Sequence, residues 1–170
     1  MAKTAWFGAV FFALSHGLAK AAMFMAAGRI RQVAGDDRLV RLTGIGQRTP
    51  LALSATALAG ISLIGLPPSG GFAGKWMLLV SGLESGEWWW SLVVVAGGLL
   101  TAGYLFRFWS IAIAASDDPE KVASINWRME LPAFALGAAA VLLVFFSASV
   151  VELLEIGATF PADPLAEVAR

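Results

Sequence analysis

The chain has 170 residues, no cysteine, a formal net charge of +0 and a mean hydropathy of +0.75. Because 58% of the residues are hydrophobic and only 14% are charged, the composition indicates a membrane protein rather than a soluble domain. The lack of cysteine excludes a disulfide framework and a thiolate metal site, and the balanced charge argues against nucleic-acid binding.

The first apolar segment, residues 4–28, is long enough to cross a membrane. It continues without a polar cleavage region, so the N-terminus does not predict a cleavable signal. His16 and Lys20 stand four residues apart within it and share one helical face. Two ionisable side chains near the middle of a span indicate a proton relay. The alternatives are a histidine paired with a neighbouring helix and a lysine that reaches the membrane interface.

The second apolar segment, residues 50–83, is too long for one crossing of ~20 residues and too short for two full spans with a turn. Adjacent prolines remove backbone donors, and adjacent glycines free the backbone direction. We therefore predict one crossing made of two half-helices, with a loop between two helices as the alternative. The predicted break, at 67–71, contains Pro67, Pro68, Gly70 and Gly71.

Lys75 follows the predicted break in an otherwise apolar window. A lysine at membrane depth costs ~2.5–3.5 kcal/mol on insertion scales, so it is rarely found there without a role. A broken helix beside an ionisable group is a recurring device for ion pathways in transporters. We therefore predict that Lys75 belongs to the relay, and the alternative is a side chain that extends to the outer interface.

Two further spans are expected at 88–115 and 131–156, joined by connections at 29–49, 84–87 and 116–130. The sequence thus predicts an all-α integral membrane protein with four transmembrane spans, the second of them a discontinuous helix. One membrane domain covers 1–157, and 158–170 form a loosely ordered tail. Small residues predict close helix packing in the last two spans: Gly97, Gly98, Gly103 and the stretch 133–140.

Basic residues in the connections predict the orientation. Seven lysines and arginines fall in the first and third connections, against two near the chain ends. The prediction is a multi-pass protein of the inner cell membrane with both termini outside the cytoplasm. Arg107 lies toward the cytoplasmic side of the third span, one turn from Tyr104, and is either an interfacial anchor or an accessory to the relay.

The sequence contains no phosphate-binding loop, dinucleotide fingerprint, metal-ligand cluster or nucleophile–base motif. We therefore expect no cofactor and no metal, and no redox chemistry in this chain. If the chain serves an ion-translocating complex of the NADH:quinone oxidoreductase type, its redox steps belong to other subunits.

Two segments resemble the antiporter-like subunits of respiratory complex I, membrane-bound hydrogenases and multisubunit cation/proton antiporters. Residues 15–28 resemble that family's H-x-x-x-K-A-x-x-F-x-x-x-G helix, with His16, Lys20 and Gly28 in place. Residues 58–75, LAGISLIGLPPSGGFAGK, resemble its second discontinuous helix, and residues 103–107, GYLFR, the end of the next one. The resemblance implies that His16 and Lys20 are central relay positions and that Lys75 is the terminal ionisable residue near the exit.

The departure from the family is its length. A full member has about fourteen helices in two inverted repeats, and this chain would correspond to the last four. The resemblance therefore implies partners: other membrane subunits, including a chain that supplies the missing N-terminal helices, in a lipid bilayer that protons or sodium ions cross. The alternatives are a non-transporting structural or assembly subunit of such a complex and a small homo-oligomeric transporter.

Overall fold

A computed structural model describes residues 2–114 and 127–157 of the chain. All regular structure in these residues is helical. The elements are α1 (Ala2–Ala34), the 3-10 turn η1 (Leu39–Leu42), α2 (Ile45–Arg48), α3 (Pro50–Ile64), α4 (Gly70–Glu84), α5 (Trp89–Ile113), α6 (Trp127–Leu142), the 3-10 turn η3 (Leu143–Phe146) and α7 (Ser147–Gly157). The predicted tail at 158–170 and Lys121 of the third connection lie outside the described residues.

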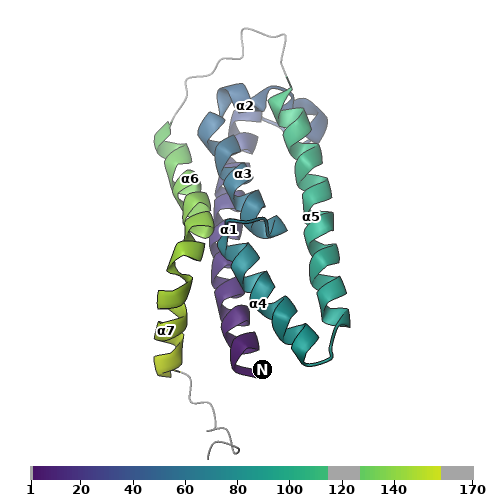
Figure 1. The fold of residues 1–170 in the computed structure, drawn as a ribbon. Coiled ribbons are helices and arrows are strands. Elements are labelled where there is room, and N and C mark those ends of the chain that lie inside the picture. Colours follow the sequence, from purple (N-terminus) through teal and green to yellow (C-terminus); the bar gives the residue numbers. More distant parts are fainter. Residues whose placement is uncertain (1, 115–126, 158–170) are drawn as a thin grey trace, which may run out of the picture.

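The central element of the bundle is α1, which packs against α3, α4 and α6 (Figure 1). The two short helices α3 and α4 follow each other end to end, with α5 along one side and α6 and α7 on the opposite side (Figure 1). The start of α1, the turn between α4 and α5, and the end of α7 lie at one end of the bundle (Figure 1). An ion pair of 2.7 Å between Lys3 and Glu155 joins α1 to α7 there.

Three helical segments are long and apolar enough to cross a membrane: Lys3–Ala34, Trp89–Ile113 and Trp127–Ile156. The last of these contains the 3-10 turn η3 between α6 and α7. The all-helical prediction is confirmed for the described residues. The predicted second span consists of two helices of 15 residues each, and one such helix measures ~22 Å at 1.5 Å per residue.

Two predicted connections are shorter than expected. The first helix continues past Gly28 to Ala34, where Gly35 adopts a positive φ of 70° and donates its N–H to the carbonyl of Arg31. Such a glycine is a common helix end. At the third connection, α6 begins at Trp127, so Glu130 is a fully buried helical residue and not part of a loop.

Small residues pack α6 closely, as predicted. Ala133 and Ala140 are buried, and a Cβ on Gly137 would lie 3.1 Å from the carbonyl oxygen of Ala55 in α3. The same prediction is wrong for two of the three glycines in α5. Only Gly98 faces a neighbour, whereas a Cβ at Gly97 or Gly103 would meet no described atom within 4 Å. Gly97 borders a cavity between the helices, and Gly103 is exposed on the surface of α5.

Candidate functional site

The interruption between α3 and α4 comprises residues 65–69. At its start, Gly65 has a φ of 88°, and the N–H groups of Gly65 and Leu66 both reach the carbonyl of Ile61. At its end, the Ser69 hydroxyl accepts a hydrogen bond of 3.1 Å from the N–H of Phe72, as a helix N-cap does. The predicted Pro67 and Pro68 lie between these two caps, joined by a cis peptide bond.

Gly70 and Gly71, predicted to lie in the break, are the first two residues of α4. Their role is close approach rather than free backbone direction. A Cβ on Gly71 would lie 1.8 Å from the carbonyl oxygen of Ser62 in α3, and one on Gly70 would lie 2.8 Å from Oγ of Ser15 in α1. The glycine pair therefore lets the start of α4 touch two other helices.

Buried serines join the three helices at this point, and the sequence interpretation missed them. Ser15 and Ser62 share a hydrogen bond of 2.9 Å between their hydroxyls, and the N–H of Gly71 donates to Oγ of Ser62 at 3.2 Å. Both serines are almost completely buried. The sequence shows both serines close to the motif residues. It does not predict which residue a serine in an apolar helix will bond to.

Lys75 lies against the C-terminus of α3. Its ammonium donates 2.9 Å hydrogen bonds to the carbonyls of Leu63 and Ile64. A cation at this position is favoured because the last carbonyls of a helix have no intrahelical partner and form the negative end of its dipole. The ring of Phe12 in α1 lies 5.9 Å from Nζ, within the range of a cation–π contact. The break thus supplies oxygen ligands for a lysine inside an apolar bundle.

His16 and Lys75 line the same cavity. It has a volume of about 250 Å³ and lies between α1, α3, α4 and α5. The His16 ring packs against Phe12 with 5.6 Å between centroids, and its nitrogens form no hydrogen bond within the described residues. Thr101 of α5 also lines the cavity. A cavity of this size has room for several waters at ~30 Å³ each.

Lys20 is half-buried in α1, one helical turn after His16. It does not line the cavity shared by His16 and Lys75, and it makes no hydrogen bond or ion pair to any described residue. Of the three predicted relay residues, the structure therefore brings two to one cavity and places the third one turn further along α1.

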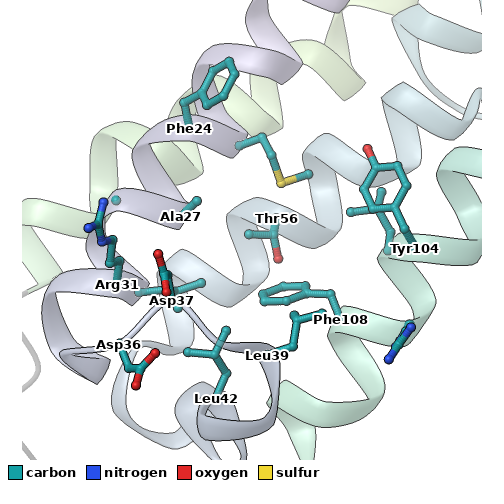
Figure 2. Close-up of a pocket in the computed structure, with 15 residues that line it drawn as sticks. Phe24, Ala27, Arg31, Asp36, Asp37, Leu39, Leu42, Thr56, Tyr104 and Phe108 are labelled. Atoms are coloured by element: carbon teal, nitrogen blue, oxygen red, sulfur yellow. The ribbon is translucent and has the colours of Figure 1, made fainter.

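The suggested accessory residues belong to a different cavity. Arg107 and Tyr104 are exposed on α5 and line a cavity of about 620 Å³ at the side of the bundle, which extends to the loop after α1. Figure 2 shows Tyr104 and Phe108 of α5 facing Ala27 and Arg31 of α1 across this cavity. Most of its lining is apolar, and its charged groups come from Arg31 of α1, from the loop after α1 and from Arg107. Neither residue lines the cavity of His16 and Lys75.

No group of three or more histidine, aspartate or glutamate side chains within the described ranges is placed to hold a metal ion. The ionisable side chains near the break are a histidine and two lysines. Three nitrogen groups on two helices, α1 and α4, lie near an interrupted helix, and two of them share a space large enough for water.

Long apolar helices with an ionisable side chain at a helix break define a class of membrane-embedded proteins with ion pathways. Residues 1–101 match the family model described as NADH:quinone oxidoreductase/Mrp antiporter, TM. The chain belongs to this family of antiporter-like membrane subunits, as its resemblance had predicted.

Individual relatives agree with this family. The chain is 35% identical over 161 residues to NADH-quinone oxidoreductase subunit N of Desulforudis audaxviator, covering 86% of this chain and 32% of that protein. It is 31% identical over 100 residues to a Na(+)/H(+) antiporter subunit of Bacillus subtilis, covering 59% of this chain and 20% of that protein. The chain thus spans about a third or less of the curated relatives that it matches.

A solved structure shows the same fold. A chain of the Mrp complex from Dietzia sp. DQ12-45-1b superposes with a TM-score of 0.77 over 86% of this chain and 36% of that chain, at 24% sequence identity. The fold of this chain is therefore shared with a chain of that Mrp complex.

Proposed function

We propose that the chain is a proton-conducting or cation/proton antiport subunit of a larger membrane complex. It crosses the inner cell membrane four times, with both termini outside the cytoplasm. The second crossing consists of α3 and α4 in series. Each alone is ~22 Å long, short of the ~30 Å hydrocarbon core, and their end-to-end arrangement supplies the remaining length. Residues 1–157 form the membrane domain.

The observation that carries the proposal is the position of Lys75. Its ammonium bonds to two carbonyls that only a helix break leaves free. A neutral amine could still donate to these carbonyls, but it would lack the positive charge that strengthens both hydrogen bonds. Release of the proton therefore weakens the contact between α4 and the end of α3. That link between protonation and helix contact is what an ion-coupled pathway requires.

The pathway runs through His16, Lys20 and Lys75 with water between them. A neutral imidazole accepts a proton on one nitrogen and releases one from the other, so His16 connects water on two sides. The shared cavity provides the space for that water beside Lys75. Charge changes in partner subunits would set when each lysine releases its proton.

The partners are other membrane subunits, and one of them supplies helices that complete the pathway. The relatives named as antiporter and NADH-quinone oxidoreductase subunits support partners of this kind. The moved ion is the proton, alone or in exchange for sodium. No cofactor is assigned to this chain.

Proton transport in everted membrane vesicles tests the function. The full chain is expressed with its genomic neighbours, and a fluorescent ΔpH probe records proton movement when sodium is added or the respiratory donor is supplied. Lys75→Ala should abolish the signal because it removes the ion from the break. Lys3→Ala is the matched control, because Lys3 is half-exposed at the surface and pairs with Glu155. Equal activity of both variants, at equal protein levels, would refute the relay through Lys75.

Purification in mild detergent tests the partner assignment. Mass spectrometry should identify several membrane subunits with the tagged chain, including one long enough to supply further helices. Recovery of the chain alone, or only with copies of itself, would reject the split-subunit proposal. A scaffold and a small homo-oligomeric transporter would then be the remaining functions.

A further inference from the structure

Glu130 is a completely buried carboxylate that the proposed relay does not use. It lies in the first turn of α6, with none of its side chain exposed. One oxygen accepts a 3.0 Å hydrogen bond from the backbone N–H of Ala52, and the other is 3.4 Å from Nε of Arg29. A buried carboxylate is retained only when its oxygens are paired, as both are here. It joins α6 to α3 and α1.

The hydrogen bond from Ala52 makes Glu130 the cap of another helix. Ala52 is the third residue of α3, where a helix N–H has no intrahelical partner. The side chain of the N-cap residue Thr49 does not accept from this N–H, because its hydroxyl donates to the carbonyl of Ile45 instead. The carboxylate of Glu130 therefore replaces the missing local cap, at the end of α3 where the helix dipole favours a negative charge.

The two ends of α3 thus carry opposite charges from two other helices. Glu130 of α6 binds the N-terminus, and Lys75 of α4 binds the carbonyls of the C-terminus. Both charges match the direction of the helix dipole. Because α3 is a rigid rod of ~22 Å, the place where its N-terminus is held determines where its last carbonyls lie.

We propose that Glu130 is a positioning residue for Lys75. By holding the N-terminus of α3, it fixes the carbonyls of Leu63 and Ile64 where they accept hydrogen bonds from the ammonium of Lys75. The competing explanation is that Glu130 serves only as the counter-charge of Arg29 and ties α6 to α1. An effect of Glu130 on transport rests on the proposed function. Its effect on the position of α3 does not, and can be tested separately.

Spin labels measure the position of the far end of α3 directly. The chain has no cysteine, so Leu66→Cys and Leu142→Cys give a clean label pair. Leu66 is the second residue after the end of α3 and Leu142 is the last residue of α6, and both side chains are exposed. Pulsed electron paramagnetic resonance on the full chain in its native complex then reports the distance distribution between them.

Three variants separate the cap from the ion pair. Glu130→Gln keeps an oxygen for Ala52 but loses the charge. Glu130→Leu loses both. The exchange Arg29→Glu with Glu130→Arg restores an ion pair but turns guanidinium donors toward the N–H of Ala52. Glu155→Leu is the matched control, because it removes the half-exposed carboxylate of α7 that pairs with Lys3.

The proposal predicts that Glu130→Gln and Glu155→Leu keep the wild-type distance distribution. Glu130→Leu and the exchange should shift its mean by about 1.5 Å or more, one residue's rise along a helix, or broaden it by that amount. A wild-type distribution in the exchange variant, or in folded Glu130→Leu, would overturn the proposal. If Glu130→Leu yields no folded protein, the distance distribution of the exchange variant still tests the proposal. The measurement needs no ion movement, so failed transport by the wild-type chain would refute the proposed function and leave this test intact.

Discussion

The two sides of α3 are packed in different ways. The buried residues of α6 recur every three or four positions along one face of that helix: Glu130, Ala133, Gly137 and Ala140. The buried residues of α5 recur only once in seven positions: Gly98, Leu105 and Ala112. The first spacing covers a continuous helix face, whereas the second covers only a narrow line. On one side of α3, α6 therefore packs along a whole helix face. On the other side, α5 packs along one narrow line and leaves space beside it.

This difference separates two environments for ionisable groups. On the α6 side, Glu130 is fully enclosed and both oxygens are paired. On the α5 side, His16 and Lys75 line a cavity, and a second, larger cavity lies further along the same helix. A group that exchanges protons needs water, and water needs incomplete packing. The comparison indicates that close packing on one side holds α3 while the other side admits water to its end.

The largest expected effect comes from Gly71→Ala. The added Cβ would lie 1.8 Å from the carbonyl oxygen of Ser62. Because this oxygen belongs to the backbone of α3, no side-chain rotation can relieve the clash. We expect a loss of more than about 3 kcal/mol of folding free energy, above the usual cost of overpacking. Gly97→Ala is the matched control on the open side, where a Cβ meets no described atom within 4 Å. Thermal unfolding in detergent should separate the two variants, and equal midpoints would contradict the close approach at the break.

A medium effect is expected from Ala140→Leu. Ala140 has no exposed surface and packs among Ala19, Ala22 and Ala59. Extra methylenes in such a contact cost about 1–3 kcal/mol. The same substitution at Ala96, which is exposed on α5, should change stability by less than about 0.5 kcal/mol. If Ala96→Leu proves as harmful as Ala140→Leu in denaturant unfolding, the two sides do not differ as described.

The parts of the site that could be predicted are those with local causes. The prolines at 67 and 68 interrupt a helix wherever they occur, so the break was placed within two residues of its observed position. The membrane class followed from composition, and the proposed relay residues were chosen as ionisable side chains in apolar segments. The assignment of Gly70 and Gly71 to the break failed, because glycine also serves where two backbones touch.

The parts that could not be predicted depend on helix rotation and on distant partners. Gly97 and Gly98 are neighbours in sequence, yet only Gly98 faces α3, and no local pattern states which one will. Glu130 follows a polar stretch that is typical of a loop, and its burial depends on Ala52, 78 residues earlier. The carbonyls of Leu63 and Ile64 can accept from Lys75 only because α3 ends at Ile64 and no further helical turn takes them. Such partners are visible in three dimensions alone.

The smallest expected effect concerns the line of contact that holds α5. Trp109 donates an indole hydrogen bond of 3.1 Å to the hydroxyl of Thr56 in α3, and its ring covers Gly60. Trp109→Phe keeps most of the ring and removes the donor, so we expect a loss of about 0.6 kcal/mol, the average for hydrogen bonds between membrane helices. Thr56 keeps its own bond to the carbonyl of Leu53 and is not left unpaired. A loss of several times this size in denaturant unfolding would show that α5 is held as firmly as α6. Because the ring supplies the remaining contact, Trp109→Ala should destabilise the chain more than Trp109→Phe does.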